Sequence, residues 1–145
     1  MKTPKTCFKP TDFYDKLPEP GFYPSSIKNA CFRRSAAKNR MLYVVYTLEG
    51  VEPAYQQLCD YFVLEGERVS EAGISLARRR LVQLYRACRL FPKEGDAIAP
   101  AGLRGCRLKV RIEHDQWLGR PQLRVVAYRP LVEFLEPDQK ISARG

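Results

Sequence analysis

The sequence predicts an all-β domain with one or two helices, in which a five-stranded antiparallel sheet curls into a small barrel. Three observations predict it. Apolar and polar residues alternate strictly from Cys106 to Glu113, the period of a strand with one buried face. Other short apolar runs are separated by segments of turn composition. Apolar residues recur at helical spacing only between Ile74 and Cys88, which places one helix between the third and fourth strands.

The first three strands are expected at residues 21–34, 41–48 and 58–64. The connection from Arg33 to Arg40 has turn composition and is cationic, whereas Gly50 and Pro53 end the second strand. In that second strand the residues predicted to face the core are Leu42, Val44, Tyr46 and Leu48, which leaves Tyr43, Val45 and Thr47 outside. Tyr61 of the third strand can then lie beside Tyr43, either as simple cross-strand packing or as a stacking platform for bases.

The helix is expected to begin after Ser70, a good N-cap residue. Five arginines lie mostly off its apolar stripe: Arg78, Arg79, Arg80, Arg86 and Arg89. They form either a solvated face or a track for phosphates. Prolines and glycines predict a loop over 91–103. The last two strands follow, the second at 123–128, joined through the segment from Asp115 to Pro121.

Three parts of the chain are expected. Residues 1–20 contain four prolines and predict an extended arm. Residues 21–135 form the domain, and residues 136–145 are a polar tail.

Composition narrows the class of function. The net charge of +9 suggests an acidic partner such as nucleic acid, although a basic protein without such a partner is the plainer alternative. No apolar run approaches the roughly 20 residues that span a bilayer, and no signal-peptide core follows Met1, so we expect a cytoplasmic protein that does not bind membranes. The five scattered cysteines and the single histidine, His114, lack metal-site spacing, so no metal or other cofactor is expected.

Catalysis is not expected either. His114 lies between Glu113 and Asp115 at the end of a predicted strand, which favours a solvated side chain. The pairs Glu65/Glu67 and Glu113/Asp115 lack a third ligand at fixed spacing, and no phosphate-binding glycine loop occurs. We therefore predict that the protein is not an enzyme.

The predicted order of three strands, a helix and two strands is that of the OB-fold barrel. Such barrels bind oligonucleotides on the face of strands two and three, between the first and last hairpin loops. Both loops are notable here, since the first is cationic and the second carries the only tryptophan. The candidate nucleic-acid contacts are Arg33, Arg34, Lys38 and Arg40 for phosphates; Tyr43, Tyr61 and Trp117 for stacking; and Arg107, Lys109, Arg111, Arg120 and Arg124 along the electrostatic path.

Several stretches also resemble a family of small phage and mobile-element proteins of unknown function. They include Gly-Phe-Tyr-Pro-Ser-Ser-Ile at 21–27, the run from Arg40 to Gly50, Asp-Tyr-Phe-Val-Leu at 60–64, and Leu-Arg-Gly-Cys-Arg-Leu-Lys-Val at 103–110. These proteins occur in replication and recombination modules. The resemblance spans roughly 21–130 and implies an OB domain like that of single-stranded-DNA-binding proteins, working beside recombinases or helicases. The proline-rich arm and the high arginine content depart from the family.

Two functions follow as expectations. In the first, the protein binds single-stranded DNA, or RNA, with little sequence preference, and supports phage or mobile-element replication and recombination. In the second, it is an adaptor that docks a recombinase, a helicase or a second copy of itself as a homodimer, without direct DNA binding.

Overall fold

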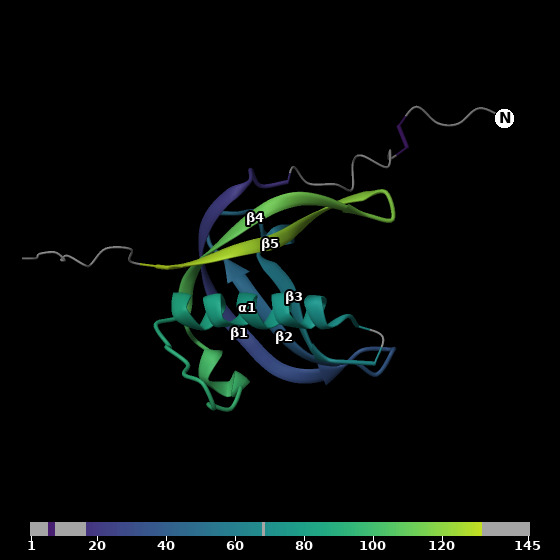
Figure 1. Cartoon of the computed structure of the whole chain (residues 1–145). Helices are drawn as coiled ribbons and strands as arrows, with labels where there is room; N and C mark the ends of the chain where they lie inside the picture. The colour runs from purple at the N-terminus through teal and green to yellow at the C-terminus, as the bar shows by residue number, and fades with distance from the viewer. Residues whose placement is uncertain (1–5, 8–16, 68, 132–145) are drawn as a thin grey trace, which may run out of the picture.

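The computed structural model describes residues 6–7, 17–67 and 69–131, apart from the side chains of Trp117 and Arg120. Its strands are β1 (Gly21–Arg34), β2 (Arg40–Leu48), β3 (Gln57–Glu65), β4 (Arg107–Trp117) and β5 (Arg120–Pro130). Helix α1 (Glu71–Ala87) lies between β3 and β4, and short 3-10 helices occupy Pro53–Tyr55 and Pro100–Leu103. Figure 1 shows α1 lying across the sheet. The predicted mostly-β class with one helix in this place is confirmed.

The five strands form one antiparallel sheet in the order β3-β2-β1-β4-β5. Strand β1 is shared, because its first half pairs with β4 and its second half with β2. The two ladders overlap at Ser25 and Ser26, and a register shift between Ile27 and Asn29 interrupts the ladder with β2 just beyond them. Within the described residues no ladder joins β3 to β5, so these strands are the two edges and the sheet is open rather than closed into a barrel.

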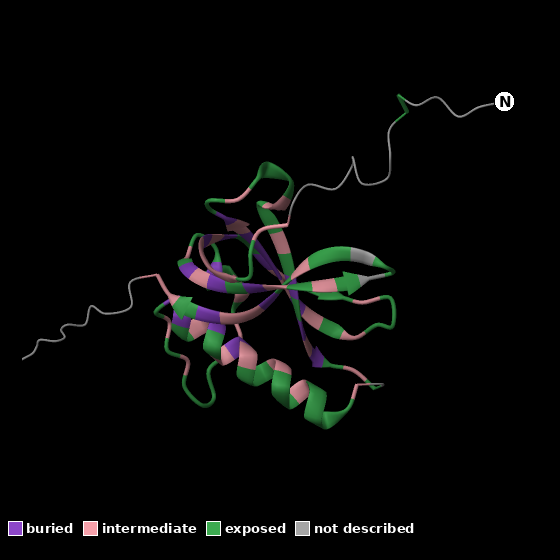
Figure 2. Cartoon of the chain, turned by 90° about the horizontal axis from the view of Figure 1, so that it is seen from above, coloured by how far each residue is buried: buried purple, intermediate pink, exposed green. Residues whose placement is uncertain are grey.

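Helix α1 covers the space between the two edge strands, since it packs against both β3 and β5. It begins as predicted, with the Ser70 hydroxyl accepting a hydrogen bond from the Gly73 amide at 3.0 Å. Leu81, Leu84 and Ala87 are buried, and Figure 2 shows exposed residues along the outer side of the helix. Burying a leucine side chain contributes about 1.5–3 kcal/mol, so this stripe fixes α1 on the sheet.

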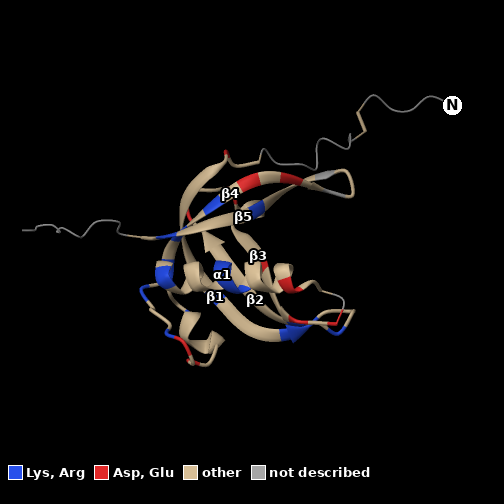
Figure 3. Ribbon diagram, in the orientation of Figure 1, with Lys and Arg blue, Asp and Glu red and all other residues tan. Residues whose placement is uncertain are grey.

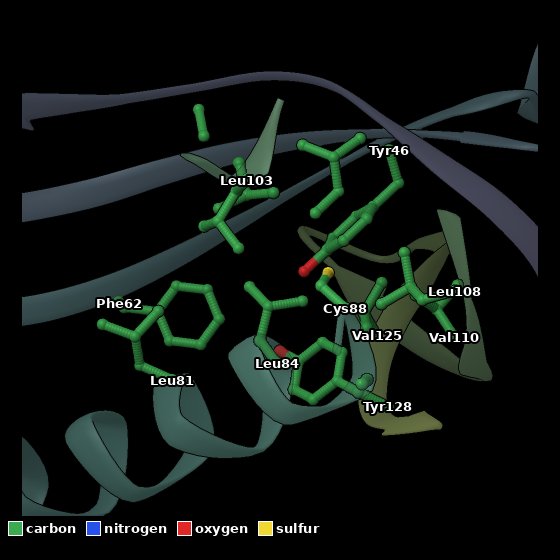
Figure 4. Close-up of a cluster of buried hydrophobic side chains, with 14 of the residues drawn as sticks. Tyr46, Phe62, Leu81, Leu84, Cys88, Leu103, Leu108, Val110, Val125 and Tyr128 are labelled. Atoms are coloured by element: carbon green, nitrogen blue, oxygen red, sulfur yellow. The ribbon is translucent and has the colours of Figure 1, made fainter. Parts of the chain in front are cut away.

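The core lies between the sheet and α1 (Figure 4). The predicted inward residues of β2 are all buried, as are Leu108, Val110 and Ile112 of β4. Val45 lies outside the core cluster as predicted, although it is only 8% exposed. One expectation was wrong, because Cys106 precedes β4 at intermediate burial rather than lying within the strand core. The alternation therefore predicts the inner face well, but not how far the outer face is covered.

The β4–β5 connection is much shorter than predicted. The strands continue to Trp117 and Arg120, and only Leu118 and Gly119 form the turn. Both have positive φ, 53° and 77°, which is the type I′ geometry of two-residue hairpins. The predicted loop over Asp115–Pro121 is thus mostly strand.

The β1–β2 connection is also shorter than predicted, because Arg33, Arg34 and Arg40 belong to the strands. Ser35 and Asn39 close the turn through a backbone hydrogen bond of 2.9 Å.

Only part of the predicted arm is described. Its last residues approach β4, where His114 Nε2 donates to the carbonyl oxygen of Pro18 at 2.7 Å. His114 therefore has a structural partner that the sequence did not reveal. The rest of the arm, apart from Thr6 and Cys7, lies outside the described residues, and so does the predicted tail at 136–145. In the described ranges, no helix has the length and apolar character needed to cross a membrane.

Candidate nucleic-acid interface

Two tyrosines, one half-buried and one exposed, form a pair on the outer face of β2 and β3. Tyr43 and Tyr61 are direct cross-strand partners, with ring centroids 5.1 Å apart and planes tilted by 40°. We call them the tyrosine platform. Tyr61 is 48% exposed, so the platform is accessible from solvent. The prediction that Tyr61 lies beside Tyr43 on the outer face is confirmed.

Cys59 holds one side of the tyrosine platform. Its Sγ lies 3.0 Å from the Tyr43 hydroxyl, and this hydrogen bond, with burial, raises the pKa of Tyr43. The phenol therefore stays neutral at physiological pH. A neutral ring held by a cross-strand partner and by a hydrogen bond is suited to stacking with a flat apolar group.

Four cations surround the β1–β2 turn beside this platform: Arg33, Arg34, Lys38 and Arg40. We call them the turn patch. The Arg33 guanidinium lies 3.9 Å from the centre of the Tyr43 ring, and that of Arg40 lies 4.5 Å from the centre of the Phe32 ring. In the described part of the chain no carboxylate forms an ion pair with any of the four. Even Glu65, the register partner of Arg40, forms none with it. The turn patch therefore keeps its positive charge available for anions.

Local hydrogen bonds fix the geometry of this turn. The Asn39 amide donates to Ser35 Oγ at 3.0 Å, and Arg34 Nη1 donates to the Lys38 carbonyl at 3.3 Å. Lys38 adopts a φ of 64°, so it supplies the left-handed residue that the turn requires. Gly66 approaches so closely that a Cβ there would lie 2.1 Å from Asn39 Oδ1. The end of β3 thus packs directly on the turn.

The cations of the second hairpin have different surroundings. Arg107 forms an ion pair with Glu49, Arg111 Nε lies 3.2 Å from Glu113 Oε2, and Arg124 Nε lies 3.8 Å from Asp115 Oδ2. Figure 3 shows both positive and negative residues on β4, with the carboxylates Glu113 and Asp115 nearer the β4–β5 turn than the cations. Lys109 lies between Pro24 and Arg129 in the sheet register and is partly buried. Three of the five cations on the predicted electrostatic path therefore lie next to a carboxylate, supplied by Glu49 and by Glu113 and Asp115 of β4.

Trp117 and Arg120 are register partners next to the β4–β5 turn. Their side chains lie outside the described structure, so their predicted contacts with nucleic acid stay predictions.

A buried polar cluster, which the sequence did not reveal, lies behind the tyrosine platform. The Asp60 carboxylate accepts hydrogen bonds from Tyr46, at 3.2 Å, from Tyr128, and from Arg80, at 3.2 Å. Arg80 Nη2 also donates to the Tyr128 hydroxyl at 2.7 Å. Asp60 Oδ1 accepts from the Tyr61 amide at 3.0 Å. The cluster therefore joins β2, β3, α1 and β5, and it fixes the backbone of one platform residue.

The titration of this cluster follows from its burial. Burial raises the pKa of Tyr46 and of Tyr128 well above the usual range, and the neighbouring Asp60 carboxylate adds to both shifts. Burial alone would lower the pKa of Arg80, but Tyr128 and Asp60 raise it overall. Arg80 is thus a structural cation, unlike the solvated arginine that the sequence favoured. The sequence contains one signal for this cluster. Asp60 is a polar residue at an inward position of β3, between the inward residues Leu58 and Phe62.

Among the described residues no group of three or more histidine, cysteine, aspartate or glutamate side chains could hold a metal ion. The sequence matches no protein-family model, and it has no significant match among curated proteins.

Proposed function

We propose that the protein binds single-stranded nucleic acid, with single-stranded DNA as the first candidate, on the outer face of β1, β2 and β3. One observation carries the proposal: the tyrosine platform, in which Tyr61 is exposed, adjoins four cations without ion-pair partners in the described residues. Proteins that bind single strands without sequence preference combine these two features, because cations follow the phosphates and aromatic rings stack on bases.

The tyrosine platform favours single strands over duplex. Every base has a face that can stack on a ring, but in a duplex both faces are covered by neighbouring base pairs. The side of a duplex would offer Tyr61 phosphates, sugars and base edges, but no base face to stack on. Stacking is also indifferent to base identity, which agrees with little sequence preference.

The OB-fold barrel is the finer architecture that we propose. OB-folds are five-stranded, partly open barrels that bind oligonucleotides on the face of strands two and three. The strand order, the approach of β3 to β5 and the position of α1 over that seam support it. The tyrosine platform lies on strands two and three. With the resemblance to phage and mobile-element proteins, this supports a role in replication or recombination and no catalytic activity.

Fluorescence anisotropy tests the proposal with labelled oligo-dT, oligo-U and a duplex of equal length, at low and high salt. We expect oligo-dT to bind more tightly than the duplex, with an affinity that falls as salt rises. Equal affinity for the duplex would exclude a role for base stacking. No binding at low salt would overturn the proposed function.

The second candidate is an adaptor that docks a recombinase, a helicase or a second copy of this chain. It is favoured by the outer edges of β3 and β5, which pair with no strand of the described chain, since an exposed edge can pair with another strand. Light scattering on the full chain and on a chain lacking residues 1–16 tests self-association. A dimer that becomes a monomer while oligo-dT affinity is retained would assign the arm to assembly.

A further inference from the structure

An open groove separates the edge strand β3 from β5 beside the tyrosine platform. Its volume is about 860 Å³, within the roughly 300–1,000 Å³ range of small-ligand sites. One wall is β3 from Gln57 to Tyr61, the other is β5 from Pro121 to Val126, and Leu76 and Arg80 of α1 also line it. No pattern in the sequence indicates this groove, because its walls come from distant segments.

The groove is continuous with the tyrosine platform. Tyr61 and Cys59 line the groove, and the same two residues contact Tyr43 on the outer face of the sheet. A strand stacked on Tyr61 therefore has its next nucleotide at the mouth of the groove.

The lining has the chemistry that recognises a base rather than a phosphate. Leu58, Leu76 and Leu123 supply apolar surface for a flat ring. Three charged groups line it, and each has a partner: Asp60 and Arg80 pair with each other, and Arg124 Nε lies 3.8 Å from Asp115 Oδ2. A phosphate there would meet the Asp60 carboxylate, and both arginines already lie next to a carboxylate.

Two amides line the groove from opposite walls, Gln57 on β3 and Gln122 on β5. Both are exposed, and in the described part of the chain neither side chain forms a hydrogen bond. Each amide offers donors and an acceptor, which is the pattern with which glutamine pairs with base edges.

We propose that this groove takes one unstacked base of the bound strand, and that Gln57 and Gln122 read its hydrogen-bonding edge. The inference rests on the proposed function. It adds a preference for base type at one position of a strand that is otherwise bound without regard to sequence.

The test compares Gln57→Leu and Gln122→Leu with the native chain, using labelled oligo-dA, oligo-dC and oligo-dT of equal length. The native chain should favour one base. Each variant should bind the favoured oligomer about five- to tenfold more weakly, while the other two oligomers change less than about twofold, because a leucine keeps the volume but not the hydrogen bonds.

Gln83→Leu is the matched control, because Gln83 is an exposed amide that lines a separate cavity near the end of α1. It should keep the native preference. If Gln57→Leu and Gln122→Leu also keep the native base preference, the proposal that the groove reads a base is overturned. The groove would then be a site where a strand of another protein pairs with β3 or β5. The same holds if the native chain binds all three oligomers equally. If the native chain binds none of them, the proposed function fails together with the inference.

Discussion

The β1–β2 and β4–β5 hairpins are both rich in arginine, and both place arginines over aromatic rings, yet they differ in how many of their cations lie next to a carboxylate. In β4–β5, Arg107, Arg111 and Arg124 each lie next to a carboxylate. In β1–β2, Arg33 and Arg40 lie over aromatic rings. An ion pair cancels the field that attracts a polyanion, whereas a cation over a ring keeps its charge. Charge density along the sequence therefore does not identify the interface, and the partners of each charge do.

The largest expected effect concerns the cluster that connects the two hairpins. Asp60→Ala should lower the free energy of unfolding by about 3–5 kcal/mol, because it leaves Arg80 and two tyrosine hydroxyls without their acceptor. Urea unfolding measures this. Asp115→Ala removes the exposed ion pair with Arg124 and should cost less than about 1 kcal/mol. Equal losses would show that the buried cluster is no more important than a surface pair.

Alkaline pH should destabilise the same cluster. Tyr46 and Tyr128 have raised pKa values in the folded state, so above about pH 10 the unfolded chain releases protons that the folded chain retains. The contribution of these tyrosines to the free energy of unfolding should thus be complete below pH 10. Above pH 10 it should fall by about 1.4 kcal/mol per pH unit for each such tyrosine. Thermal unfolding between pH 8 and 11 follows this change. Tyr128→Phe should make the decline shallower, and an unchanged decline would contradict the assignment.

Removing one aromatic from the tyrosine platform and one from the β4–β5 hairpin compares the two surfaces directly. Tyr61→Ala should weaken oligo-dT binding by about 1–3 kcal/mol, because a base loses its stacking partner, whereas Tyr61→Phe should keep most of the affinity. Anisotropy titrations of both variants and of Trp117→Ala provide the measurement. If Trp117→Ala loses as much affinity as Tyr61→Ala, the β4–β5 hairpin binds the strand together with the tyrosine platform.

Salt dependence gives the smallest and most selective difference. Replacing Arg33 and Arg40 with glutamine should lower the log–log salt slope of oligo-dT binding by about 0.7 for each phosphate that is no longer neutralised. The same replacement at Arg107 and Arg111 should leave the slope near its native value, because their carboxylate partners already neutralise them. The reverse result would place the interface on β4–β5.

The sequence predicted the strands and the inner face well, because both depend on local periodicity. β1 spans Gly21–Arg34 as expected, and Ser70 caps the helix. The position of Tyr43 and Tyr61 on the same outer face was also predictable, because residues alternate between the two faces in each of the neighbouring strands.

What the sequence missed depends on contacts between distant segments. Asp60 meets Tyr128 across β3 and β5, and Arg107 meets Glu49 from another part of the chain. No local pattern encodes such pairs. The two-residue β4–β5 turn was also missed, because Leu118 at positive φ is an unusual choice for a type I′ turn.

The divided pairing of β1 has a consequence for synthesis of the protein. Its second half can form a hairpin with β2 soon after both emerge, but its first half pairs with β4, which the ribosome makes much later. At about 5–20 residues per second, the segment from Gly21 to Ser26 is left without its final partner for several seconds. Pro24 lies in the middle of that segment and lacks a backbone donor, which limits pairing with a wrong strand. A nascent chain stalled before β4 should therefore contain a formed β1–β2 hairpin beside an unpaired strand end.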